Sequence, residues 1–586
     1  MGIIKKLWSL LDRQERRAAI ILLVLMIVGM ALEAIGVAMI LPVLSVMTDP
    51  TIFEAHPLLL QVWEYYGRPT QSQLVVGVLV MLLIVSLIKA SFLAFLTWRQ
   101  AEFVARLQSS VAQSLFEGYL RLPWTFHLQR NSAELIRNVT TEIHGFSNGL
   151  VIPSLTLFTE LTVLLGIAVL LLAIEPQGTL LAAIFLGASI LIYYQMARVP
   201  LMQWGVNRQF HEGQRIKHLQ QALGSVKDVM LLGREDEFIS QYRVHNEAGA
   251  RILKLQTTLA QLPRIWLELL SVLALTVLGL SMLAQGKDAG EIIPVFGMFA
   301  AAAFRLLPST SRMLWAMQSI RFASPIVDTL LHEMQLIGLG RTREEVKKIL
   351  PSLDRIELDR VSYVYPDTRN KVLDEISLTI PKGMAIGIIG ESGAGKSTLV
   401  DIILGLVQPV SGRLSVGGMD IQLSLREWQD RIGYVPQAIY LTDDSIRRNV
   451  ALGLDEKHID AAALDRAIKA ARLEDFVASL PEGLETLVGE RGVRLSGGQR
   501  QRIGIARALY HDPEVLVFDE ATSALDNQTE REVVDAMRLL KKGKTIIMVA
   551  HRLSTLEDCD VIYQIHQGAI VRKEPPFSER SVDHRV

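Results

Sequence analysis

The chain has 586 residues, more than one hydrophobic core usually organises, so two or more domains are expected. A formal net charge of -1 gives no reason to expect a nucleic-acid partner, and the single cysteine, Cys559, excludes an intramolecular disulfide framework. Hydrophobic residues make up 50% of the chain and are concentrated in its first half, which excludes an ordinary soluble protein over the whole length.

The first half contains six apolar stretches that are each long enough to cross a bilayer, which requires about 20 mostly apolar residues. Basic residues lie before the first stretch, between Lys5 and Arg17, and this bias indicates a cytoplasmic N-terminus. The first stretch is also too long for the apolar part of a signal peptide. An even number of crossings returns the chain to the cytoplasm. The predicted spans are residues 18–47, 74–98, 146–174, 179–197, 265–283 and 292–314.

The segments between the spans differ in length and polarity. The outside connections at residues 175–178 and 284–290 are short turns that contain Pro or Gly. The inside connections at residues 99–145 and 198–264 are long, polar and helical in pattern. We therefore expect the spans to continue as helices into the cytoplasm and to turn back through short cross-helices, near residues 122–131 and 221–233.

The first outside loop, residues 51–67, mixes aromatic and aliphatic side chains with scattered polar ones. This pattern suits an amphipathic helix at the outer membrane surface, and it suits equally a loop that packs on the spans. Residues 326–355 are charged and are predicted to be a linker. The predicted domains are thus a membrane domain over residues 1–325 and an α/β domain over residues 356–586, where strand and helix patterns alternate.

A glycine-rich segment, GESGAGKST, lies between two apolar runs that are predicted to be a strand and a helix. This context and spacing are typical of a phosphate-binding loop, in which backbone N–H groups and a helix N-terminus meet phosphate oxygens. Lys396 is expected to reach the β- and γ-phosphates of ATP, and Ser397 to ligate Mg²⁺. The alternative, a turn that binds nothing, is disfavoured by these two residues. The predicted ATP-binding residues here are Gly390, Glu391, Ser392, Gly393, Ala394, Gly395, Lys396, Ser397 and Thr398.

An apolar strand that ends in two acids follows at Val515–Glu520, VLVFDE. Alone this pattern is weak, because many strands leave a sheet through acidic residues. After a phosphate-binding loop in the same α/β domain, it predicts the second element of an ATPase. Asp519 would hold the Mg²⁺ shell, directly or through water, and Glu520 would act as general base on the attacking water.

Between these two motifs lies LSGGQ, at Leu495, Ser496, Gly497, Gly498 and Gln499. The three motifs in this order closely resemble the ATP-binding cassette (ABC) family, and the resemblance covers the whole second half of the chain. It implies that Tyr365 stacks on adenine and that His551 contacts the γ-phosphate. It also implies that Gln437 senses the γ-phosphate and binds Mg²⁺ together with Ser397 and Asp519. Glu520, His551 and Gln437 would be the catalytic residues.

Two further segments match the family. VGERG, at Val488–Gly492, resembles the loop that touches the cross-helices in exporters. SALD, with Ser523 and Asp526, resembles the loop that couples two ATP sites. In the family the LSGGQ segment, Ser523 and Asp526 serve the ATP held by the other subunit, so two cassettes close head to tail around two ATP molecules.

One cassette preceded by six spans with long cytoplasmic helices resembles a half-transporter of the exporter branch, the type IV exporter fold. Because no site departs from the family pattern, a homodimer is the simplest assembly, and a heterodimer stays open. ATP would favour an outward-facing cavity and hydrolysis would reset it, which is alternating access. The cofactors implied are ATP and Mg²⁺.

Ionisable residues inside the spans are costly and often functional, so they are the candidates for cargo binding. Lys89, Arg305 and Arg312 along one cavity wall would suit a phosphate or diphosphate headgroup. Glu33 and Glu160 lie midway along the first and third spans. In the alternative interpretation Lys89 and Arg312 extend to the cytoplasmic interface, and Glu33 or Glu160 pairs with Arg305.

The outer segment and the character of the first span make the membrane half similar to bacterial flippases of lipid-linked oligosaccharides. Lipid A flippases and multidrug exporters share this architecture. We therefore expect a flippase for an amphipathic anionic lipid in a bacterial inner membrane, with a drug or peptide exporter as the alternative. A protein that binds ATP without transport is a third possibility. The spans and the net charge argue against an ABC protein that remodels nucleic acid.

Overall fold

The structure is a computed structural model that describes residues 3–39, 71–174, 176–284, 289–341, 349–366, 368, 370–521, 538, 541, 543–550 and 553–574. The chain divides between residues 342 and 343 into a helical unit and an α/β unit. The whole outer segment, residues 51–67, lies outside the described residues, so the prediction made for it stays a prediction.

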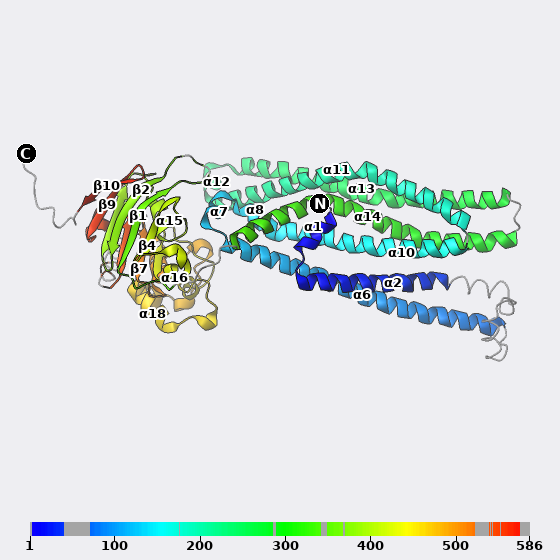
Figure 1. Cartoon of the computed structure of the whole chain (residues 1–586), viewed down its shortest axis with the longest axis horizontal. Helices are drawn as coiled ribbons and strands as arrows, with labels where there is room; N and C mark the ends of the chain where they lie inside the picture. Colours follow the sequence, from blue (N-terminus) through cyan, green and yellow to red (C-terminus); the bar gives the residue numbers. More distant parts are fainter. Residues whose placement is uncertain are drawn as a thin grey trace, which may run out of the picture. The chain divides into compact units, whose positions relative to one another are not determined.

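Long helices that lie side by side make up the helical unit (Figure 1). Helix α2 packs on α6, α11 packs on α13, and α14 packs on α10, α11 and α13. The bounds are α1 Ile3–Leu10, α2 Arg13–Ala38, α6 Gln71–Arg121, α10 Ile152–Ile174, α11 Pro176–Gly224, α13 Glu235–Ala284 and α14 Ala289–Arg341.

Several of these helices run well beyond the predicted spans, as the polar helical pattern of the inside connections indicates. Short elements occupy the two expected turning points. These are α7 Trp124–Gln129, followed by α8 Ser132–Arg137, and α12 Val226–Leu232. Gly233 ends α12 with a φ of 60°, the left-handed conformation that glycine adopts at helix ends.

Each predicted span lies on a separate helical stretch, although α2 ends at Ala38 and residues 40–47 are not described. Among the described residues, three helical stretches are long and apolar enough to cross a membrane, namely Arg13–Gly36, Val75–Arg121 and Ser132–Val169. Six crossings therefore remain a prediction. The structure differs from the expected linker, because α14 continues through residues 326–341 as a helix.

The helical run that leads into α10 contains two π-helical segments. Two π-helical segments alternate with a short α-helix before α10 begins at Ile152. A π-turn holds an extra residue and commonly marks a functional site or a point of strain. The elements are η1 Asn138–Glu142, α9 Ile143–Phe146 and η2 Ser147–Val151.

Helix α14 approaches its neighbours closely because they present glycine to it. A Cβ atom added at Gly205 on α11 would lie 2.1 Å from the Phe322 carbonyl oxygen, and one at Gly149 would lie 2.8 Å from the Ala323 Cβ. Polar groups add to this contact, since Gln209 on α11 donates to the Thr329 hydroxyl on α14 at 3.4 Å. Small residues at such interfaces are the usual basis of helix association in membranes.

The α/β unit contains two sheets. The six-stranded sheet has the order β10-β9-β3-β8-β7-β6, in which only β10 is antiparallel to its neighbour. The four-stranded sheet, β2-β1-β4-β5, is antiparallel. The strands are β1 Arg355–Tyr363, β2 Leu373–Pro381, β3 Ala385–Gly390, β4 Ser411–Val416, β5 Met419–Asp420, β6 Ile432–Val435, β7 Val515–Asp519, β8 Thr545–Val549, β9 Val561–His566 and β10 Ala569–Glu574.

Both faces of the six-stranded sheet are packed in hydrophobic clusters, which explains the continuous apolar runs in its strands. Along β7, Leu516 and Phe518 join one hydrophobic cluster, whereas Val515 and Val517 join the other. The α-helices are α15 Lys396–Ile403, α16 Leu425–Asp430, α17 Ile446–Val450, α18 Ala461–Ala470, α19 Glu474–Ser479 and α20 Gly497–Leu509; 3₁₀ turns lie at Ile421–Leu423, Glu456–His458, Gly483–Glu485, Glu490–Gly492 and Leu553–Leu556.

We expect Gly205→Ala to lower the thermal unfolding midpoint of the detergent-solubilised protein, because the added methyl group forces α11 away from α14 at a cost of about 1–3 kcal/mol. The matched control is Gly187→Ala on the same helix, where a Cβ meets no atom within 4 Å. There the better helix propensity of alanine should leave the midpoint unchanged or raised. Equal midpoints for the two variants would contradict the close contact.

Candidate nucleotide-binding site

The predicted phosphate-binding loop leaves the carboxyl end of β3 and enters α15. Two of its glycines are required by their surroundings. A Cβ atom at Gly390 would lie 2.4 Å from the Ile565 carbonyl oxygen, and one at Gly395 would lie 2.7 Å from the Val372 carbonyl oxygen. Gly395 also has a φ of 100°, which disfavours any other residue. The loop is therefore shaped as the motif predicts, with the N-terminus of α15 at its end.

Lys396 is almost completely buried, with 5% of its surface exposed. Its ammonium group donates to the carbonyl oxygens of Gly390 at 2.9 Å and Glu391 at 3.0 Å. The positive charge thus lies folded over the loop, close to the first turn of α15. Ser397 is exposed at the start of that helix, where a hydroxyl ligand is accessible. This arrangement fits a polyphosphate together with a divalent cation.

Tyr365 is positioned by contacts on two sides. Its hydroxyl shares a hydrogen bond of 3.1 Å with the Thr398 hydroxyl on α15. Its ring meets that of Tyr363 edge-on, with the ring centroids 5.1 Å apart. Thr398 is buried, so this contact fixes the aromatic side chain near the phosphate-binding loop. The structure therefore brings together residues that the sequence separates by more than thirty positions.

The carboxyl ends of β6 and β7 bring three more predicted residues together. Asp519 is the last residue of β7, and Glu520 follows with a φ of 48°, a strained conformation for a residue other than glycine. The Glu520 N–H donates to the Val549 carbonyl oxygen at 2.9 Å. The Gln437 side-chain amide donates to the Glu520 carboxylate at 2.7 Å. The proposed general base is thus oriented by the neighbouring strand's end.

The carboxyl ends of β6 and β7, together with the first turns of α15, form a corner whose electrostatic environment favours a cation. Burial and the neighbouring Glu520 carboxylate raise the pKa of Asp519, while the Lys396 ammonium lowers it. Sequence reasoning missed Asp401 on α15. Burial and the Asp519 carboxylate raise the pKa of Asp401 to about 6. The available signal was its position one helical turn after Ser397, on the same face of the helix.

The oxygen donors of this corner fit Mg²⁺, which prefers carboxylate and hydroxyl ligands and keeps several waters. The Asp519 carboxylate raises the pKa of Asp401 because two nearby carboxylates repel when both are ionised, and a divalent cation between them would relieve that repulsion. Among the described residues no group of three or more His, Cys, Asp or Glu side chains could hold a metal alone.

The LSGGQ segment forms the N-terminus of α20. The Ser496 hydroxyl accepts from the Gln499 N–H at 3.2 Å, and the Gln499 side chain accepts from the Ser496 N–H at 2.8 Å. This reciprocal capping box leaves Ser496 and Gly497 exposed. Within the described residues, none of the hydrogen bonds of this segment reaches the phosphate-binding loop.

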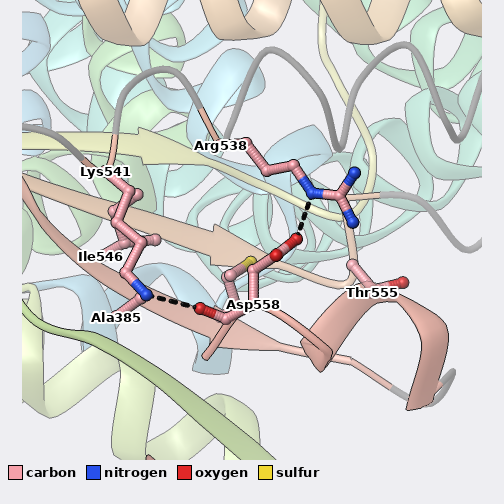
Figure 2. Close-up of a pocket in the computed structure, with 7 residues that line it drawn as sticks. Ala385, Arg538, Lys541, Ile546, Thr555 and Asp558 are labelled. Carbon is pink, nitrogen blue, oxygen red and sulfur yellow. Dashed lines mark hydrogen bonds and ion pairs between the residues drawn. The ribbon is translucent and has the colours of Figure 1, made fainter. Parts of the chain in front are cut away.

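Three predicted residues, His551, Ser523 and Asp526, lie outside the described residues. Elsewhere in the α/β unit, Figure 2 shows a cavity near Ala385, the first residue of β3 and hence at the far end of that strand from the loop. Its volume is about 10 Å³, enough for one water molecule at most. Arg538 and Lys541 reach across it to Asp558, to the carboxylate and the carbonyl oxygen respectively. This cavity is not a nucleotide site.

In the helical unit, the predicted cargo residues differ in their contacts and burial. Arg312 on α14 pairs with Glu160 on α10, whose side chain is 8% exposed. The alternative interpretation had paired Glu33 or Glu160 with Arg305, whereas Glu160 pairs with Arg312. Lys89 lies beside α2, where a Cβ at Gly36 would be 3.4 Å from its ammonium nitrogen, and Glu33 on α2 is buried. Arg305 lies on α14, and its side chain is outside the described part of the chain.

Comparison with known proteins supports both units. Residues 17–304 match the family described as ABC transporter transmembrane region, and residues 373–523 match the family described as ABC transporter. An ATP-dependent lipid A-core flippase of Ralstonia nicotianae is 30% identical over 470 residues, which cover 79% of this chain and 78% of the relative. The chain belongs to the ABC transporter family.

Other relatives agree with that assignment. An ATP-dependent lipid A-core flippase of Alkalilimnicola ehrlichii is 31% identical over 486 residues, with 80% of this chain and 79% of the relative covered. A solved structure of a bacterial Atm1-family ABC exporter with ATP bound matches with a TM-score of 0.74 over 96% of each chain at 23% identity, so it has the same fold. The predicted fold class is confirmed. The chain is an ABC exporter, a translocase that hydrolyses ATP.

Replacing Tyr365 tests the adenine contact. We expect Tyr365→Ala to weaken ATP binding about tenfold, since stacking of a base on an aromatic ring is worth about 1–3 kcal/mol. Tyr365→Phe loses only the hydrogen bond to Thr398 and should stay within about twofold of the wild-type affinity. Calorimetric titration with ATP measures both constants. Equal losses in the two variants would assign the effect to the hydroxyl and contradict stacking.

Proposed function

We propose that the chain is one half of a homodimeric flippase that moves an amphipathic anionic lipid, such as a lipid-linked oligosaccharide, across a bacterial inner membrane. The N-terminus and the α/β unit lie in the cytoplasm. ATP binding favours the outward-facing state, and hydrolysis resets it. The observation that carries the lipid cargo is the similarity, over about four fifths of the chain, to relatives named lipid A-core flippases.

The ATP site acts through residues of this chain that the fold holds in place. The loop N–H groups, the Lys396 ammonium and the N-terminus of α15 bind the phosphates. Ser397, Asp519 and Gln437 hold Mg²⁺, which neutralises phosphate charge when bound. Glu520 accepts a proton from the attacking water, and its hydrogen bond from Gln437 fixes the direction of its carboxylate.

The exposed position of Ser496 and Gly497 in the LSGGQ segment supports a dimer. An exposed helix N-terminus with a satisfied cap offers N–H groups to a phosphate that belongs to another molecule. Ser496, Gly497 and Gly498 therefore complete the ATP site of the second subunit, with Ser523 and Asp526 coupling the two sites. His551, two positions after the end of β8 at Val549 in the sequence, contacts the γ-phosphate.

We predict that co-expressed, differently tagged chains show complementation in ATP hydrolysis. A heterodimer of Lys396→Ala and Ser496→Asp chains keeps one intact site when each site takes its loop from one chain and its LSGGQ from the other. Placing both substitutions on one chain, paired with wild type, destroys both sites. Tandem affinity purification and a phosphate-release assay compare the two heterodimers. Lower activity in the heterodimer with divided substitutions would overturn assembly in trans.

In the membrane, the pairing of Arg312 with Glu160 changes which cations serve the cargo. One guanidinium paired with one carboxylate has no net charge, so the Arg312–Glu160 pair contributes less to anion binding, and Lys89 and Arg305 become the principal contacts of the headgroup. The buried Glu33 and Glu160 then position cations rather than bind cargo themselves. A multidrug or peptide exporter is the alternative function, because the same architecture serves both.

Proteoliposomes that contain the full chain distinguish these cargoes. Lipid-linked oligosaccharide and lipid A-core should stimulate ATP hydrolysis, hydrophobic drugs should not, and Glu520→Gln should hydrolyse ATP at least about 100-fold more slowly. Lys89→Gln and Arg305→Ala should lower the ratio of lipid-stimulated to basal hydrolysis. Lys254→Gln, exposed on α13, is the control with an unchanged ratio.

Stimulation by drugs alone would overturn the flippase proposal in favour of the exporter. Turnover in the wild type no faster than in Glu520→Gln would indicate a protein that binds ATP without transport.

A further inference from the structure

A small cavity lies between α2 and α6, near the charged beginning of α2. Its volume is about 40 Å³. The back of the cavity belongs to a packed cluster, in which Leu22 is buried, whereas Ile21 at the opposite side is 56% exposed. The cavity therefore has a buried apolar wall at Leu22 and an exposed edge at Ile21. Its lining residues are Ala18, Ile21, Leu22 and Leu25 from α2 and Arg99, Glu102, Phe103 and Arg106 from α6.

The polar side of the cavity carries excess positive charge. Glu102 accepts from both Arg99, at 2.6 Å, and Arg106. One carboxylate thus faces two guanidinium groups, each of which has five N–H groups and uses one on Glu102. The Arg106 side chain is 74% exposed. Both arginines can donate to an anion without giving up Glu102.

The cavity lies where both helices change from charged to apolar residues. On α2 the apolar run begins at Ala18, directly after Arg17, and on α6 the predicted span ends at Trp98, directly before Arg99. Trp98 is 60% exposed, and the Arg99 guanidinium lies 5.8 Å from its ring centroid. Exposed tryptophan beside arginine is typical of the headgroup level of a membrane.

We infer that this cavity binds an anionic phospholipid from the leaflet on the side of the chain's N-terminus. The phosphate contacts Arg99 and Arg106, the cavity takes part of the phosphodiester, and an acyl chain follows the exposed edge at Ile21. A zwitterionic lipid fits less well, because its cationic group needs an anionic partner. Glu102, the carboxylate of the cavity lining, already accepts from both arginines. Free phosphate would leave the apolar wall without a partner. The inference takes from the proposed function only that these helices lie in a membrane.

Photolabelling of the full-length protein in nanodiscs tests this site. The probe is phosphatidylglycerol with a diazirine near the headgroup, and peptide mapping measures labelling of residues 18–25 and 99–106. We expect about tenfold less labelling with the matching phosphatidylethanolamine probe, and about tenfold less in the Arg99→Gln/Arg106→Gln variant. Arg121→Gln, exposed on the same helix outside the cavity, should label as the wild type does.

Competition identifies the source of the phosphate. Unlabelled phosphatidylglycerol should displace the probe, and inorganic phosphate and lipid A-core should not. Equal labelling by both probes, or displacement by inorganic phosphate, would overturn the inference. Displacement by lipid A-core would overturn it too, since the cavity would then belong to the cargo path. Because labelling needs no hydrolysis, the Glu520→Gln protein should give the same pattern even if the flippase proposal fails.

A second variant separates lipid binding from a structural role. Glu102→Gln frees both arginines, so labelling by phosphatidylglycerol should stay equal or rise. If the three residues served only to hold α6, labelling in Glu102→Gln would fall as it does in the arginine variant, and the inference would be wrong. Should the double variant fail to fold, the single Arg106→Gln at an exposed position replaces it, with an expected loss of about fivefold.

Discussion

Close backbone contact along α14 is the constraint on which the helical unit depends. Apolar helices gain little from the hydrophobic effect when lipid surrounds them, so dense packing has to supply their association. Gly118, Gly149 and Gly205 come from three different elements, and each lets a neighbour approach α14 where a larger side chain would collide. Helix α14 thereby sets the positions of elements that are far apart in sequence, and the hydrogen bond from Gln209 to Thr329 adds to the same contact.

In the α/β unit, the corresponding constraint is the parallel sheet, which positions the residues of the nucleotide-binding site. Because β3, β6, β7 and β8 end at one edge, the chemistry-bearing residues that follow them meet there. The cost of this arrangement is visible at Glu520, whose left-handed backbone is worth about 1–3 kcal/mol of strain. Hydrogen bonds to Val549 and from Gln437 maintain it. The same turn therefore strains the Glu520 backbone and orients its carboxylate.

Local patterns predicted much of this protein, because spans, strands and the phosphate-binding loop depend on residues close in sequence. The extended helices and their turning points followed from the same reasoning. Interactions between distant residues could not be predicted in this way. Arg312 found Glu160 across 152 positions, and Asp401 gained its role only from the sheet that places Asp519 beside it. Charged residues between Arg341 and Lys348 suggested a linker over residues 326–355, whereas residues 326–341 are mostly apolar and continue α14, with Val327 and Leu330 buried in its packing.

The two π-helical segments before α10 have a further effect on the third span. Each π-turn adds one residue to a helical turn, so the side chains after it are rotated by about 100° relative to a regular α-helix. Two such turns between Asn138 and Val151 shift the phase by about 200°. A single helical wheel drawn through this region would therefore place Glu160 on the side of the helix opposite to its actual direction. The azimuth of every residue of α10 depends on two extra residues that lie before it.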